Sequence, residues 1–222
     1  MGNTIMQKAM ATAGLAVACA LVGCGESSTQ PKVVDPAIHE PPIVREDSPA
    51  RKKATAGPRT LKPTIVSGVA MAPQTLFDGK LRILVPQTFT QMPESEVASL
   101  FKGSSRPDVV FQSVDKQMFI IVAHLKDPLL PDQVKGAFEG VKKGMLAAYP
   151  DSTSRSETLA EVDGRTWMRF DLDGEKRAMV AVTSLDGRTL RIETTFLSKP
   201  EPKLTDAVKK MWETAVIVDG HS

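Results

Sequence analysis

Beyond Pro73, apolar residues recur at every second position in short runs, and Asp-Gly pairs separate several of these runs. Such alternation is typical of strands, and Asp-Gly readily adopts the positive φ angles of tight hairpin turns. The pattern therefore predicts antiparallel strands joined as hairpins. The predicted strands are 75–77, 80–85, 108–114, 117–125, 153–162, 165–172, 176–185 and 188–197, and the Asp-Gly pairs fall at 78–79, 163–164, 173–174 and 186–187.

Two segments carry apolar residues at helical spacing instead. Residues 131–149 place a stripe of apolar side chains from Val134 to Ala148 on one face, after a proline that suits a first turn. Residues 202–216 carry a similar stripe that includes Trp212. We predict helices over both segments and a shorter helix at 94–101.

The order of these elements predicts an α+β domain over residues 74–222. Strand 117–125 is apolar on both faces, so it should be central and covered on both sides. We expect one antiparallel sheet of about six strands, flanked by helices on both faces.

The N-terminal region contains a different kind of segment. Residues 9–23 form an uncharged apolar run after Lys8, too short to span a bilayer but of the length found in signal peptides. The tetrad Leu21-Val22-Gly23-Cys24 resembles the bacterial lipobox, which implies a signal peptide at 1–23, loss of Cys19 and acylation of Cys24. An uncleaved or alanine-box signal remains the alternative; N-myristoylation is disfavoured because Met6 stands where that motif needs Ser or Thr.

Residues 24–73 combine the lipidated cysteine with a proline-rich, polar stretch that has almost no aromatic residues. Such a composition cannot bury enough apolar surface to fold alone. We therefore predict a disordered tether between the anchor and the domain. The basic run 51–53 within it could touch anionic headgroups or cell-wall polymer, although such a run in a linker is more often simply solvated charge, which we favour.

Several segments of the domain together resemble a known family. They are the hairpin opening FDGKLRILVPQTF at 77–89, the helix PDQVKGAFEGVKKGMLAAYP at 131–150, the four-strand meander, and the C-terminal helix with Trp212. Their order resembles the Mog-type, PsbP-like fold, and in particular the bacterial DcrB-like lipoproteins. The resemblance implies a non-enzymatic binding or assembly role and offers no catalytic motif.

The search for reactive residues gives few candidates. The net charge is only +2, so nucleic acid is not an expected partner. The sequence contains no phosphate-binding loop, nucleophile elbow or zinc-binding helix motif. The three histidines, at 39, 124 and 221, are far apart, and the carboxylates at 171, 173 and 175 lack the spacing of a calcium loop. We expect no metal, no cofactor and no enzymatic activity.

One strand offers a candidate ligand-binding face. Arg165, Trp167 and Arg169 alternate along one side of strand 165–172, and Arg177 and Arg191 on later strands could join them. An indole beside guanidinium groups suits stacking on a ligand or pairing with an anion. The alternative, which we favour, is that Trp167 packs beneath a helix while the arginines extend past it to solvent.

A second candidate lies on the predicted helix 131–149. Gly136, Gly140 and Gly144 recur at four-residue spacing, and each glycine inside a helix costs about 1 kcal/mol relative to alanine. The three leave a shallow groove where the backbone of a partner protein could approach. Close packing against the chain's own loops explains them equally well.

Together these features predict a lipoprotein of the bacterial cell envelope, anchored through acylated Cys24 and facing the periplasm. Its domain would bind an envelope protein without catalysis. A secretion-system accessory or immunity-like chaperone is the alternative, and an envelope enzyme is a more distant one. The absence of Asp directly after Cys24 favours the outer over the inner membrane, as the lipoprotein resemblance implies.

Overall fold

The computed structural model describes residues 60–103 and 106–218. The predicted signal peptide at 1–23, Cys24, and residues 24–59 of the predicted tether lie outside the described residues. Strands begin at Thr64, ten residues before the predicted start of the domain at 74. The hairpin of β1 and β2 turns at Ser67-Gly68, and the strong proline bias of the surrounding sequence masked it.

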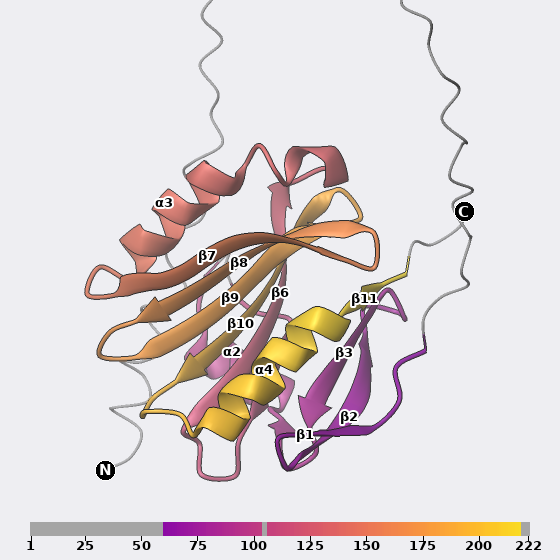
Figure 1. Ribbon diagram of the computed structural model, residues 1–222, viewed down its shortest axis with the longest axis vertical. Helices are drawn as coiled ribbons and strands as arrows, with labels where there is room; N and C mark the ends of the chain where they lie inside the picture. Colours follow the sequence, from indigo (N-terminus) through magenta and orange to yellow (C-terminus); the bar gives the residue numbers. More distant parts are fainter. Residues whose placement is uncertain (1–59, 104–105, 219–222) are drawn as a thin grey trace, which may run out of the picture. The chain divides into compact units, whose positions relative to one another are not determined.

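Eleven strands and three α-helices follow one another in the described residues (Figure 1). The strands are β1 Thr64–Val66, β2 Val69–Leu76, β3 Leu81–Pro86, β4 Thr90–Gln91, β5 Val109–Gln112, β6 Met118–Pro128, β7 Thr153–Val162, β8 Arg165–Asp173, β9 Arg177–Leu185, β10 Arg188–Phe196 and β11 Val216–Ile217. The helices are α2 Glu94–Leu100, α3 Phe138–Ala148 and α4 Pro202–Thr214, with a short 3₁₀ turn η1 at Pro131–Gln133.

The α+β class, with antiparallel pairing throughout, is confirmed. The strands form two sheets where one was expected: a seven-stranded sheet in the order β4-β5-β6-β10-β9-β8-β7 and a four-stranded sheet in the order β1-β2-β3-β11. β11 follows α4 and pairs with β3, at the opposite end of the domain sequence. Such long-range pairing leaves no local pattern in the sequence.

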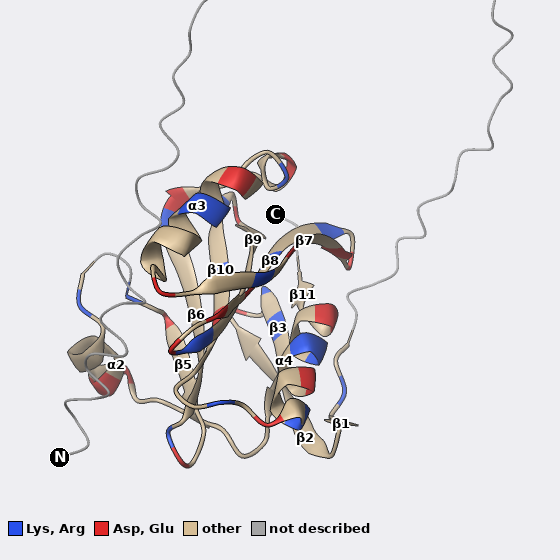
Figure 2. Cartoon of the chain, turned by 60° about the vertical axis from the view of Figure 1, so that its left-hand side comes forward, with Lys and Arg blue, Asp and Glu red and all other residues tan. Residues whose placement is uncertain are grey.

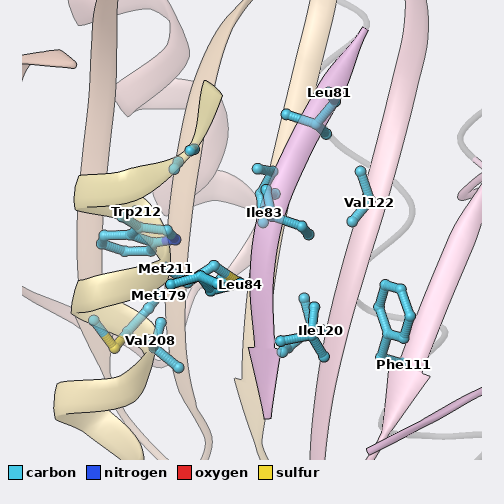
Figure 3. Packing of buried hydrophobic residues seen from close by; sticks show 14 of the residues in the cluster. Leu81, Ile83, Leu84, Phe111, Ile120, Val122, Met179, Val208, Met211 and Trp212 are labelled. Carbon is cyan, nitrogen blue, oxygen red and sulfur yellow. The ribbon is translucent and has the colours of Figure 1, made fainter. Parts of the chain in front are cut away.

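Helices cover both faces of the large sheet, as predicted. On one face, α4 and the small sheet bury the largest core, in which Figure 3 shows Leu84 of β3 beside Met211 of α4, and β6 on the other side of β3. On the opposite face, α3 packs over β8 and β9, and α2 packs over β5 and β6. We call these the α4 face and the α3 face of the large sheet. None of the described helices is both long and apolar enough to cross a bilayer.

Some of the predicted Asp-Gly turns have the expected positive φ angles, and others differ. Asp163-Gly164 and Asp186-Gly187 both have positive φ and make two-residue hairpins, as predicted. The pair at 78–79 lies in a four-residue loop, in which Phe77 also has positive φ. Gly174 keeps a negative φ, and is a glycine because a Cβ there would lie 2.7 Å from Oγ of Ser152 and 2.8 Å from the carbonyl oxygen of Asp151.

Candidate ligand-binding groove beside α4

A groove lies between α4 and strands β7 to β9, on the α4 face of the large sheet. Its volume is about 260 Å³. We call it the α4 groove. Ser156 and Thr158 of β7, Arg169 and Asp171 of β8, and Lys209 and Trp212 of α4 supply its polar and aromatic lining.

Arg169 reaches the groove from the middle of β8. Its Nη2 donates to the carbonyl oxygen of Trp212 at 2.8 Å, and its guanidinium carbon lies 6.0 Å from the centre of the Trp212 ring. The last carbonyls of a helix have no partner within the helix, so this hydrogen bond caps the C-terminal end of α4. The Nε of Arg169 is buried and has no hydrogen-bond partner among the described residues.

The charge of Arg169 is partly desolvated and lies near the carboxylate of Glu213. Burial lowers the pKa of Arg169, and the negative charge of Glu213 on α4 opposes this effect. Arginine nevertheless remains a cation under physiological conditions. Lys209 and Glu213 of α4 also line the groove, so it presents hydrogen-bond donors together with charges of both signs to whatever enters it.

Asp171, the groove's acidic residue on β8, is already engaged. Arg177 of β9 donates to it twice, from Nε to Oδ1 at 3.0 Å and from Nη2 to Oδ2 at 2.7 Å. This bidentate pair raises the pKa of Arg177. Nη1 of Arg177 also lies 3.4 Å from the hydroxyl of Thr205, so the pair links β8, β9 and the first turns of α4.

A second hollow of about 470 Å³ opens at the tips of the neighbouring hairpins. Arg155 of β7, Arg177 and Lys199 line it together with Asp173 and Glu175. Nη1 of Arg155 lies 3.4 Å from Oδ2 of Asp173, so the acidic cluster considered for calcium is held partly by arginines. Within the described residues, no three His, Cys, Asp or Glu side chains gather as a metal site requires.

The structure separates the residues of the predicted ligand-binding strand. Only Arg169 lines the groove. Trp167 is 1% exposed and belongs to the main core, as expected for an indole packed beneath a helix. Arg165 lies at the opposite end of β8, with Nη1 3.5 Å from the carbonyl oxygen of Ser184.

Of the two arginines expected to join this strand, one does so. Arg177 lies on the α4 face beside Asp171. Arg191 lies on the α3 face, because the register of β10 places it beside Val182 of β9, a member of the α3 core. The expectation that Arg191 joins Arg169 was therefore wrong. Alternation divides the residues of one strand between two sets, but it does not say which face of the sheet each set occupies.

The three glycines do not share one helix. Gly140 and Gly144 lie on α3, whereas Gly136 lies in the turn between η1 and α3. The helix begins at Phe138, seven residues later than predicted, after the proline has started the short 3₁₀ turn. A partner at Gly140 and Gly144 stays a prediction.

Sequence reasoning missed Trp212 and Lys209 as groove residues. Trp212 has the spacing of a core-facing helical position, and it is indeed largely buried. Only the packing of α4 against β7 to β9 places part of this side chain beside a cavity. No local signal in the sequence distinguishes such a position from ordinary core.

Comparison with known proteins gives structural similarities alone. No protein-family model and no curated protein matches the chain. The solution structure of cyanobacterial PsbP (CyanoP) from Synechocystis is 12% identical, with a TM-score of 0.48 over 75% of this chain and 99% of that one. The Ran-binding protein Mog1p of Saccharomyces cerevisiae is 14% identical, with a TM-score of 0.46 over 68% of this chain and 97% of that one.

A third structure, from Bacteroides thetaiotaomicron, is 9% identical with a TM-score of 0.42, and the match covers 68% of this chain and 49% of that one. The PsbP-like and Mog-type proteins named from the sequence thus recur among similar solved structures. These similarities concern the fold, and none of them carries a function to this chain. Membership of the DcrB-like lipoproteins stays a prediction.

Proposed function

We propose that this chain is a lipid-anchored protein of the bacterial cell envelope whose domain binds an envelope protein, without catalysis, through the α4 groove. In this proposal Cys24 carries the acyl chains and residues 25–59 connect the lipid to the domain. The partner presents a carboxylate or another acceptor-rich group to Arg169. The domain faces the periplasm, and the outer membrane is the favoured location.

The anchor is supported by the sequence. An uncharged run after Lys8 ends in Leu21-Val22-Gly23-Cys24, where small residues precede a cysteine at the point where the composition becomes polar. Acyl chains on Cys24 would hold the protein at a membrane without a spanning segment.

One observation carries the binding role: the guanidinium of Arg169 lies in a cavity with Nε buried and without an acceptor among the described residues. Leaving a buried donor unpaired costs about 1–3 kcal/mol. The Arg169 side chain also lines the groove, so a ligand with a negatively charged acceptor can pair with its guanidinium there, and hydroxyls of Ser156 and Thr158 on the opposite wall can add hydrogen bonds.

The same lining favours binding over catalysis. It contains neither histidine nor cysteine. Of its two carboxylates, Asp171 is paired with Arg177, and the exposed Glu213 lies 3.5 Å from the ammonium group of Lys210. A general base needs a free group with a pKa near the working pH, and a nucleophile needs such a base beside it. The groove supplies charge and hydrogen-bond donors, which suit recognition.

The anchor is tested by the intact mass of protein extracted from membranes. Wild type should show cleavage before Cys24 plus the mass of acyl chains, and Cys24→Ala should lose both the acyl mass and membrane retention. Cys19→Ala is the matched control, because Cys19 leaves with the signal peptide and the mature mass should not change. A soluble, unacylated wild-type protein would refute the anchor.

The groove is tested by placing a photo-cross-linking amino acid at the exposed Ser156 and, as a control on the other face, at the exposed Lys143 of α3. We expect one protein partner to be captured from Ser156 and not from Lys143. Lys209→Glu, which reverses a charge on the groove wall, should reduce that capture. Equal capture from both sites, or capture unaffected by Lys209→Glu, would contradict the proposal.

A further inference from the structure

The large sheet ends at β7, and no described strand covers the outer edge of β7. It is the last strand in the order of the sheet, and its partner among the described strands is β8 (Figure 1). The pairing is regular over residues 156–162, between an irregularity at Ser154 and Ser156 and the Asp163-Gly164 turn. Such an edge presents unpaired backbone donors and acceptors, which form a template for a further strand.

The turn determines which backbone groups of β7 are unpaired. In a two-residue hairpin the residues that flank the turn exchange both hydrogen bonds, so Val162 and Arg165 form a hydrogen-bonded pair. Hydrogen-bonded and non-hydrogen-bonded pairs then alternate along the two strands. The N–H and C=O groups of Glu157, Leu159 and Glu161 therefore point away from β8, toward the open edge. A strand that adds to β7 would pair with these three residues.

On the α4 face, the open edge borders the α4 groove. Ser156 and Thr158 of β7 line this groove, and Arg169 lies directly opposite Thr158 on β8. Figure 2 shows α3 and α4 on opposite sides of β7 to β9. A strand beyond β7 would lie two strand spacings, about 10 Å, from β8. A glutamate opposite Thr158 and the long side chain of Arg169 can approach each other across this distance.

On the α3 face, the side chains of the same edge are apolar and acidic. Leu159 is 39% exposed. Glu161 is exposed, and its carboxylate accepts a hydrogen bond from the neutral hydroxyl of Thr166 at 2.6 Å. The carboxylate of Glu157 already lies 2.6 Å from the ammonium group of Lys142 on α3. A complementary strand therefore carries an apolar residue opposite Leu159, a basic residue opposite Glu161 and a neutral residue opposite Glu157.

We propose that an extended segment of the partner protein adds to β7 as an antiparallel strand with the pattern basic, any residue, apolar, acidic, neutral. Its backbone pairs with Glu157, Leu159 and Glu161, and its acidic side chain enters the α4 groove. This inference rests on the proposed function, because that side chain supplies the carboxylate that the groove binds. A second copy of this chain fits the edge poorly: antiparallel pairing centred on Leu159 would place Glu157 opposite Glu161 of the other copy.

The test measures amide hydrogen exchange by NMR in the full chain with the peptide acetyl-Thr-Lys-Thr-Val-Glu-Thr-Thr-amide. We expect saturating peptide to slow exchange at Glu157, Leu159 and Glu161 at least tenfold, and to change little at Thr158 and Ala160, whose amides already pair with β8. The matched control peptide exchanges its Lys and Glu, and should need at least tenfold higher concentrations for the same protection.

Three results would overturn the proposal. The first is unchanged exchange at the three outward amides, even where the Nε–H resonance of Arg169 shifts, since the peptide would then occupy the α4 groove alone. The second is equal protection by the control peptide. The third is protection that the free chain already shows and that grows with protein concentration, because a second copy would then occupy the edge.

A variant separates strand addition from binding in the groove. Leu159→Pro removes one outward N–H and leaves the hydrogen bonds between β7 and β8 in place, because proline is tolerated where the N–H of an edge strand faces solvent. It should abolish partner capture from Ser156, whereas the matched control Leu159→Ala keeps the N–H and should retain capture. Amide resonances of β8 report whether each variant is folded. Capture retained in folded Leu159→Pro would overturn strand addition alone, whereas no capture in wild type would contradict the proposed function itself.

Discussion

Two arginine–carboxylate pairs, one on each face of the large sheet, have opposite geometries. Arg177 and Asp171 close into a bidentate pair at 3.0 and 2.7 Å, with both side chains 15% exposed. Arg191 and Glu193 are buried more deeply, yet they meet at 3.7 Å without a hydrogen bond. Burying Arg191 and Glu193 therefore costs more desolvation free energy, yet no hydrogen bond between them offsets that cost.

This difference separates a pair that joins elements of the fold from a pair whose hydrogen bonds the chain leaves incomplete. The closed pair fastens α4 to β8 and β9 through Thr205, and its hydrogen bonds are satisfied within the chain. The open pair has a fixed carboxylate and a donor that the chain itself does not satisfy. A buried ion pair is favourable only when its geometry is good. The two pairs should therefore lose different amounts of the free energy of unfolding when one partner is removed.

The largest effect is expected for Glu193→Ala, which leaves Arg191 buried without a counter-charge. Breaking a buried pair from one side costs about 3–5 kcal/mol of the free energy of unfolding. Urea denaturation followed by the fluorescence of the two buried tryptophans measures this loss. A loss below about 1 kcal/mol would mean that Arg191 reaches water, and that the pair is less buried than its exposed fraction indicates.

A smaller loss is expected for Asp171→Ala on the α4 face. The variant removes two hydrogen bonds to a charged group, but Arg177 is partly exposed and can be rehydrated. We expect a loss of about 1.5–3 kcal/mol in the same denaturation experiment. A loss larger than that of Glu193→Ala would reverse the comparison.

The tyrosine on the open pair gives a pH-dependent prediction. The hydroxyl of Tyr149 donates to Oε1 of Glu193 at 2.6 Å, and burial together with the charge of Glu193 raises the pKa of Tyr149 in the folded chain. Its contribution to stability is therefore complete below the pKa of an unfolded tyrosine, about 10, and is lost as the pH rises above that value. The free energy of unfolding should fall by roughly 1.4 kcal/mol per pH unit in that range because the unfolded state releases the proton first.

Tyr149 is the chain's one tyrosine, which makes the measurement unambiguous. Phenolate absorbance should appear only together with unfolding, and Tyr149→Phe should remove this part of the alkaline instability. Absorbance of phenolate in the folded protein near pH 10 would show that Tyr149 is accessible to solvent.

The smallest effect is expected for an exposed pair on the surface. Nζ of Lys80 lies 2.6 Å from Oδ2 of Asp186, but the two side chains are 39% and 46% exposed. Solvent screens such a pair, so Lys80→Ala should change the free energy of unfolding by at most about 1 kcal/mol, and by less at high salt. A loss that matches Asp171→Ala would show that distance, and not burial, sets the strength of these pairs.

The sequence alone determined the local elements of the domain. It predicted the meander of β7 to β10 nearly residue by residue. Period-two alternation and the two Asp-Gly turns depend only on residues that are close together in the sequence. It also predicted α2 and α4, and a helix before β7, although the start of α3 was misplaced. These features depend on neighbours in the chain.

Only the tertiary structure decided what lies together across the chain. The pairing of β11 with β3 makes a second sheet, the register of β10 puts Arg191 and Glu193 beside Tyr149, and the packing of α4 leaves a cavity next to Arg169. Alternation assigns side chains to two faces but does not choose between them, and it says nothing of how closely two groups approach. That choice is made by contacts between residues far apart in sequence.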